Sequence, residues 1–212
     1  MKLMLFKEHS IVRSSPPEYK DYKNYREHLE NDFRHRCAYC NLLDSRITTP
    51  FEIDHFVPKK AFEGIWDELV NTYENLMYSC KKCNNAKRAQ FSGEIHPPDI
   101  KNELFYNPTV VDYNDVFFRN EYGAINSDDE KGLDMIIRLH LYRPIHSLAW
   151  ICEILFELES TLKRAIEKEV LKERKDKLKE AHYKICEYYI ELSQLFISSY
   201  NDKKLKLFDF QD

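Results

Sequence analysis

The sequence predicts an α+β protein in which a small zinc-stapled unit of two strands and one helix precedes a mainly α-helical region. Two C-x2-C hooks bracket a short segment that carries an Asp-His pair. Four cysteines in such hooks can close a tetrahedral zinc site that holds structure. In the C-terminal half, apolar residues recur at helical spacing over long stretches. The cysteines of the two hooks are Cys37, Cys40, Cys80 and Cys83.

The composition is that of a globular protein rather than a disordered one. Of 212 residues, 43% are hydrophobic and 32% are charged, and the net charge of −4 excludes a surface that binds polyanions throughout. No apolar run has membrane-spanning length and the N-terminus does not resemble a signal peptide, so we expect a cytoplasmic protein. Cysteine hooks there are metal ligands rather than disulfides. Cys152 and Cys186 lie on apolar helix faces and are expected to be buried thiols.

The N-terminal helix and the core are expected within residues 1–92. An apolar stripe predicts one helix over residues 17–34, and the first hook follows as a tight turn. Residues 47–57 alternate in polarity and predict a hairpin. Residues 61–70 fit either a short helix or an ordered insertion. Good helix formers in residues 84–90 predict a helix that opens at the second hook.

Residues 93–212 are expected to hold a short β segment and a helical region that serves interaction or oligomerisation. The sequence His96-Pro97-Pro98 indicates a linker or a domain edge. Residues 110–125 predict short strands joined by a turn, and helices follow. The charged stretch at residues 168–180 fits either a solvated helix or a bend between two antiparallel helices.

Asp54 and His55 are the residues whose chemistry we expect the core to use. A carboxylate is a hard oxygen ligand that suits Mg²⁺ or Mn²⁺. A histidine, whose ordinary pKa is near neutrality, can take a proton from an attacking water. Neighbouring residues of a strand point to opposite faces, so both side chains reach one phosphate only near a strand end. Pro58 supplies that end.

The motifs of this segment stand in the order of a known family. They are the two hooks, Ile53-Asp54-His55-Phe56-Val57-Pro58-Lys59, Glu74-Asn75-Leu76 and Cys83-Asn84-Asn85-Ala86-Lys87. In these motifs the chain resembles the HNH endonucleases, whose core is a ββα-metal finger. The resemblance covers residues 33–91. A weaker likeness extends to the Septu-type HNH nucleases of bacterial phage defence, which have a helical C-terminal half and act with an ATPase.

The resemblance implies roles for individual residues. His55 would be the general base and Asp54 a ligand of the catalytic metal. Asn75 would tie the loop that orients His55, and Asn84 would be the second metal ligand, which makes this an H-N-N variant. The implied ions are catalytic Mg²⁺ or Mn²⁺ and structural Zn²⁺. The residues expected to contact nucleic acid are Lys59, Lys60, Lys87 and Arg88.

The predicted function is metal-dependent hydrolysis of phosphodiester bonds in nucleic acid, in DNA rather than RNA, as the nuclease of a phage-defence system. An ATPase partner and self-association both stay open. The main rival is a catalytically inactive zinc-stabilised module that binds nucleic acid or protein, and the intact motif residues argue against it. Zinc deaminases carry Pro before the hook, where this chain has Ser79. A redox dithiol enzyme would carry one hook in a βαβ context, so two hooks without that context argue against this alternative.

Overall fold

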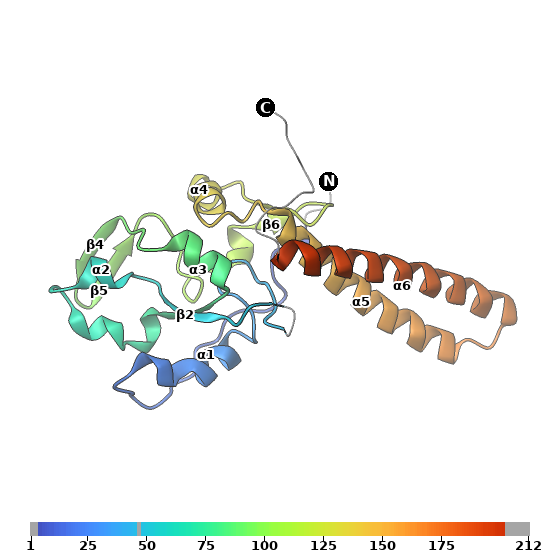
Figure 1. Cartoon of the computed structure of the whole chain (residues 1–212), viewed down its shortest axis with the longest axis horizontal. Helices are drawn as coiled ribbons and strands as arrows, with labels where there is room; N and C mark the ends of the chain where they lie inside the picture. Colours follow the sequence, from blue (N-terminus) through green and yellow to red (C-terminus); the bar gives the residue numbers. More distant parts are fainter. Residues whose placement is uncertain (1–3, 46–47, 202–212) are drawn as a thin grey trace. The chain divides into compact units, whose positions relative to one another are not determined.

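The computed structural model describes residues 4–45 and 48–201, and the chain divides into two compact units, Met1–Tyr142 and Arg143–Asp212 (Figure 1). Short helices and small antiparallel sheets build the first unit, and two long helices build the second. The predicted α+β class is confirmed. The division expected at residue 92 falls inside the first unit, because strands on both sides of it pair with one another.

The centre of the first unit is an antiparallel strand pair followed by a helix. Strand β2 (Glu52–His55) pairs with β3 (Leu76–Ser79), and α3 (Lys81–Lys87) begins directly after the second hook opens. The hairpin predicted over residues 47–57 is therefore wrong, and Ile47 lies outside the described residues. All four residues of β3 are buried, so this pairing places an apolar strand in the core.

An ordered insertion connects β2 to β3. It consists of α2 (Lys59–Phe62) and two short 3₁₀ helices, η2 (Asp67–Val70) and η3 (Tyr73–Asn75). Of the two alternatives for residues 61–70, an ordered insertion is the one observed, built from single turns. Each turn buries one large side chain against the core, and these side chains are Phe62, Leu69 and Tyr73.

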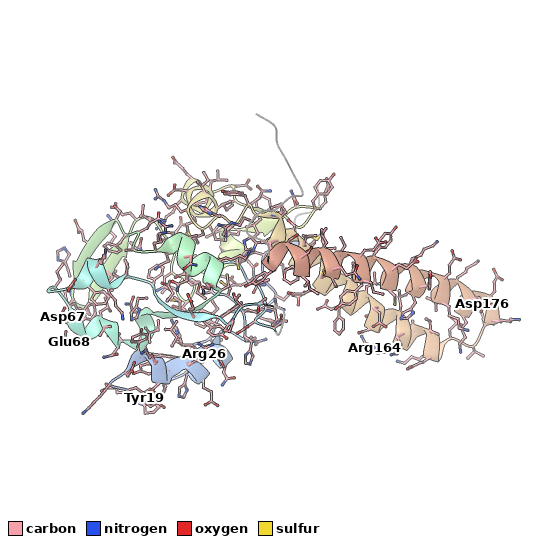
Figure 2. All side chains as sticks on the ribbon, in the orientation of Figure 1. Tyr19, Arg26, Asp67, Glu68, Arg164 and Asp176 are labelled. Carbon is pink, nitrogen blue, oxygen red and sulfur yellow. The ribbon has the colours of Figure 1, made fainter. Side chains whose placement is uncertain are left out.

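The N-terminal helix is shorter than the predicted span of residues 17–34. It comprises η1 (Tyr22–Tyr25) and α1 (Arg26–Asp32). The carboxylate of Asp21 accepts a hydrogen bond from the backbone N–H of Lys23 and so fixes the start. Arg34 adopts a positive φ of 51° just beyond the helix. Arg26, labelled in Figure 2, donates to the backbone oxygen of Phe51 at 3.1 Å and ties α1 to the residue before β2.

Two further antiparallel sheets complete the first unit. Strands β1 (Met4–Leu5), β6 (Phe118–Arg119) and β7 (Ile125–Asn126) form one sheet in that order. The other is a hairpin of β4 (Gly93–His96) and β5 (Asp99–Asn102).

The linker predicted at His96-Pro97-Pro98 is instead the turn of the β4–β5 hairpin. Gly93 begins this hairpin at φ 138°, and a side chain there would collide with the backbone oxygen of Lys101. Helix α4 (Glu130–Arg138) follows β7, and the side chain of Asp129 caps it by accepting from the N–H of Gly132.

The second unit is an antiparallel pair of long helices, α5 (Pro144–Lys168) and α6 (Lys172–Asn201) (Figure 1). Pro144 suits the first turn of α5, where its missing N–H costs no hydrogen bond. The charged stretch from residue 168 holds both a bend and the solvated start of α6. Within residues 4–45 and 48–201, no helix has the length and apolar character that crossing a membrane requires.

Candidate metal centre and active site

Four buried cysteines bring their sulfur atoms together from the two hooks. All four Sγ atoms lie within 4.8 Å of one another. The first hook is a tight turn, and the N–H of Ala38 within it donates to the backbone oxygen of Tyr78 on β3 at 2.8 Å. The second hook is the first turn of α3, where Sγ of Cys80 accepts from the N–H of Cys83 at 3.4 Å. The four residues are those that the sequence predicts: Cys37, Cys40, Cys80 and Cys83.

The spacing of this cluster fits a zinc ion. With Zn–S bonds of about 2.3 Å, a tetrahedral site places its sulfur atoms roughly 3.8 Å apart. The Sγ atoms of Cys40 and Cys80 are separated by 3.8 Å. Burial raises the pKa of the Cys40 thiol. Thiolates gathered in such a place require a cation to stay ionised, so the cluster has the chemistry of a structural metal site.

His55 lies at the end of β2, and its ring is enclosed by the insertion. Its Nε2 donates to the backbone oxygen of Val70 at 2.9 Å. A carbonyl oxygen only accepts hydrogen bonds, so Nε2 carries the proton and Nδ1 carries a lone pair. The ring meets that of Tyr22 edge-on, with centroids 4.8 Å apart. Burial lowers the pKa of His55 to about 4 despite the bond to Val70, so the imidazole is neutral at pH 7.

Asp54 points to the other face of β2, under α3. The ammonium of Lys87 lies 3.1 Å from each carboxylate oxygen, and the hydroxyl of Tyr39 donates to Oδ2 at 2.5 Å. Lys87 also donates to the backbone oxygen of His55 at 2.7 Å. Burial raises the pKa of Asp54, and the charge of Lys87 opposes that shift. This buried pair holds β2 against α3.

Lys87 is buried, whereas the sequence predicts that it contacts nucleic acid at the surface. Its side chain is 0% exposed, whereas a contact with a phosphate of bound nucleic acid requires an accessible ammonium. In the structure, the ammonium of Lys87 instead contacts the carboxylate of Asp54 and the backbone oxygen of His55.

A second polar bridge stands beside the buried pair. The Nδ2 of Asn84 donates to Oε2 of Glu52 at 2.7 Å. Glu52 and Asp54 are two residues apart on β2 and share a face, while Asn84 and Lys87 are three apart on α3 and share a face. Glu52 and Asn84 are both partly exposed. This edge thus offers solvent a carboxylate and an amide carbonyl, both hard oxygen donors.

Asn75 braces the segment that follows His55. Its Oδ1 accepts from the N–H of Val57 at 2.8 Å, and its Nδ2 donates to the backbone oxygens of Val57 and Leu69 at 3.2 and 3.3 Å. The backbone oxygen of Asn75 accepts from the N–H of Phe56 at 2.8 Å. One buried amide therefore joins the end of β2 to the insertion that carries Val70.

The remaining basic residues are exposed. Lys59 begins α2, and its ammonium lies 4.4 Å from the ring centroid of Tyr22, the ring that packs against His55. Lys60 is exposed on the same turn, and Arg88 is exposed at the end of α3. Lys59 is thus brought close to His55, whereas Arg88 lies beyond the helix that carries Asn84.

Sequence reasoning missed four residues that shape the site. Tyr39 donates a hydrogen bond to Asp54, and its position between the two cysteines of the first hook could have indicated that it lies near the site. Glu52 stands two residues before Asp54 on a strand, so alternation could have indicated it. Tyr22 contacts His55 from a helix distant in sequence. Val70 acts through a backbone oxygen, which residue type does not reveal.

The stretch from the first hook to the end of α3 matches a known family. Residues 37–90 match the model of the HNH endonuclease. This segment is an HNH endonuclease domain. The resemblance predicted from the motifs is confirmed, and the HNH domain includes both hooks, β2, β3 and α3.

The chain is also similar to the Septu protein PtuB of Bacillus thuringiensis. The two are 30% identical over 106 residues, which is 50% of this chain and 36% of that protein. The match therefore spans little more than a third of the relative's length. No solved structure matches the chain. The likeness to Septu-type HNH proteins expected from the sequence is thus found, over half of the chain.

Proposed function

We propose that this protein is a metal-dependent endonuclease that hydrolyses phosphodiester bonds of nucleic acid, with DNA as the expected substrate. The observation that carries the proposal is the state of His55 within the HNH domain. Its imidazole is neutral at pH 7, its Nε2 hydrogen is held by Val70, and its Nδ1 can accept a proton.

The four cysteines are proposed to hold a structural Zn²⁺. Four thiolates complete a tetrahedral site, so no position is left for substrate. The first hook is bonded to β3 and the second begins α3. A zinc ion there would keep His55 and Asn84 in register from the two sides of the finger.

A catalytic Mg²⁺ or Mn²⁺ is proposed beside α3, with Asp54 and Asn84 as ligands and the Glu52 carboxylate as a further oxygen donor. The donor types fit such an ion, and Glu52 and Asn84 are already bonded to each other at 2.7 Å. Asp54 can bind the same ion only if its carboxylate gives up part of the ion pair with Lys87. When bound, the ion supplies positive charge for the pentacovalent transition state and the leaving 3′ oxygen.

His55 is proposed to take the proton from the water that attacks phosphorus in line, which leaves 5′-phosphate and 3′-hydroxyl ends. No proton has to leave the imidazole first, because its pKa lies near 4 in the protein alone. Phosphate oxygens beside the ring would raise this pKa, since negative charge stabilises the imidazolium. The base would therefore be stronger in the complex than in the unbound protein.

Exposed basic residues are proposed to hold the nucleic-acid backbone. Lys59 and Lys60 lie on the turn after His55, and Arg88 follows α3. Contacts of this kind fix the position of the strand without reading its sequence.

We also propose a cellular role in bacterial phage defence, in the cytoplasm, with an ATPase as partner. The similarity to a Septu protein supports this role. The helical second unit, which lies outside the HNH domain, is the proposed region for interaction or oligomerisation.

A cleavage assay tests the proposed reaction. The purified protein is incubated with supercoiled plasmid DNA and with RNA, in Mg²⁺, Mn²⁺ or EDTA. We expect nicked or linear DNA with either ion and intact DNA with EDTA, and the new ends should carry 5′-phosphates. Intact DNA and RNA under all conditions, from protein that binds both zinc and nucleic acid, would favour the inactive binding module instead.

A further inference from the structure

Three side chains of metal-ligand type meet between the two long helices of the second unit. Glu159 comes from α5, and His182 and Cys186 come from α6. One ligand atom from each residue lies within 4.8 Å of the other two. The Nε2 of His182 is 2.9 Å from Oε1 of Glu159 and 3.8 Å from Sγ of Cys186. No residue of the HNH domain takes part in this cluster.

Helical spacing explains how the cluster forms. His182 and Cys186 are four residues apart and therefore lie on one face of α6, one turn from each other. Glu159 meets them from the antiparallel α5. Figure 2 labels Arg164 on α5 and Asp176 on α6, both near the connecting turn of the helix pair. In the sequence, Glu159 precedes Arg164 by five residues and His182 follows Asp176 by six.

The distances are near those of a tetrahedral zinc site. With Zn–N bonds of about 2.0 Å and Zn–S bonds of about 2.3 Å, the nitrogen and sulfur ligands lie roughly 3.5 Å apart. The observed separation of 3.8 Å requires a shift of only a few tenths of an ångström. An ion would replace the hydrogen bond between His182 and Glu159, whose 2.9 Å would open by a similar amount.

Burial and charge also suit a bound cation. The side chains of His182 and Glu159 are 28% and 25% exposed, so an ion could enter from solvent and still be largely shielded. The carboxylate of Glu159 lies beside the imidazole of His182 and offers an anionic oxygen ligand to a bound cation. Cys186 and Cys152 are both only partly buried, whereas the sequence predicts buried thiols.

We propose that Glu159, His182 and Cys186 form a second metal site, for a divalent transition ion such as Zn²⁺, which cross-links α5 and α6. Thiolate and imidazole ligands favour Zn²⁺ over Mg²⁺ or Ca²⁺. Three protein ligands leave the fourth position for water or for a ligand from another molecule. The site shares no residue with the four-cysteine cluster, and its proposal does not depend on whether the HNH domain cleaves nucleic acid.

Metal content tests this site directly. Zinc bound per chain is measured by inductively coupled plasma mass spectrometry on the full-length protein, after loading and removal of weakly bound metal. We expect wild type to hold one equivalent more than Cys186→Ala and His182→Ala. The matched control is Cys152→Ala, whose thiol on α5 accepts from Ser193 and lies outside the cluster, and it should equal wild type. Equal zinc in wild type, Cys186→Ala and His182→Ala would overturn the proposal.

A cobalt titration of the wild type supplies a readout that needs no variant to fold. Co²⁺ bound to thiolates gives charge-transfer absorption in the near ultraviolet. We expect two binding phases. One comes from Co²⁺ at the four-thiolate cluster, and the other, with a weaker absorption band, comes from Co²⁺ bound to the single thiolate of Cys186. Only the second phase should be lost in Cys186→Ala. One phase in the wild type would contradict the second site, whatever the protein does to DNA.

Discussion

Lys87 and Asp54 form a buried ion pair whose loss should destabilise the HNH domain. The ammonium is fully enclosed and lies 3.1 Å from both carboxylate oxygens. Lys87→Met leaves that carboxylate buried without its partner, so we expect the free energy of unfolding to fall by about 3–5 kcal/mol. Urea unfolding followed by circular dichroism measures the change. The exposed Lys60→Met is the control, expected to stay within about 0.5 kcal/mol of wild type. Equal, small losses in both variants would contradict the pairing.

The low pKa of His55 predicts where the pH–rate profile of DNA cleavage declines on its acid side. If the neutral imidazole is the base, as proposed, kcat/KM for DNA should hold from neutrality downward and decline only as pH approaches about 4. An exposed histidine would lose activity near pH 6.5. The same shift affects stability: from pH 6.5 toward 4 the unfolded chain takes up the proton first, so stability should fall as pH falls. An acid limb centred near pH 6.5 would contradict the enclosed position of His55.

Residue types identify part of this site and burial decides the rest. The four cysteines and His55 can be read from spacing, because few other roles use two hooks around an Asp-His pair. The buried position of Lys87 cannot be predicted from spacing, because lysine is usually exposed and the burial of this one depends on how α3 packs on β2. Val70 is beyond sequence reading because every residue has a carbonyl oxygen.

Among the elements, α3 depends most on a single side chain. Cys80 is one of the four clustered thiols, and its sulfur also caps the helix at the N–H of Cys83. Cys80→Ser keeps an oxygen that can cap but removes a thiolate from the proposed zinc site, and such sites supply much of the folding energy of small domains. We expect lower zinc content and a lower yield of folded protein.

Zinc content and circular dichroism after purification measure the effect of Cys80→Ser. Cys152→Ser on α5 changes a thiol outside the four-cysteine cluster and should leave both quantities as in wild type. A Cys80→Ser protein that is fully folded and free of zinc would contradict the structural role of the cluster.

The secondary structure was predictable where local patterns decide it. The helix that opens at the second hook and the long C-terminal helices follow from the hook spacing and from apolar periodicity. Local patterns did not predict which strand pairs with β2. A neighbouring segment and Leu76–Ser79 were both possible partners, and the choice depends on which of them is buried more fully. The β4–β5 hairpin was missed because its Pro97-Pro98 turn has the composition of a linker.

For the whole molecule, the domain boundary depends on contacts between distant residues. Strand β1 pairs with β6, which lies beyond the HNH match that ends at residue 90, and the first unit extends to Tyr142. Composition changes near residue 93, which suggests an earlier boundary, but composition does not report strand pairing. The second unit, from Arg143, is the helical region that the sequence predicts for the C-terminal half.

The central claim is that His55 is the base of a metal-dependent nuclease. The most direct measurement compares DNA cleavage rates at saturating Mg²⁺ for wild type, His55→Ala and His96→Ala, each checked for folding and zinc. His96 is the control because its side chain is 77% exposed on β4, outside the HNH domain. We predict that His55→Ala slows cleavage by on the order of 10²–10⁴-fold while His96→Ala does not. Equal rates for wild type and His55→Ala would contradict the account.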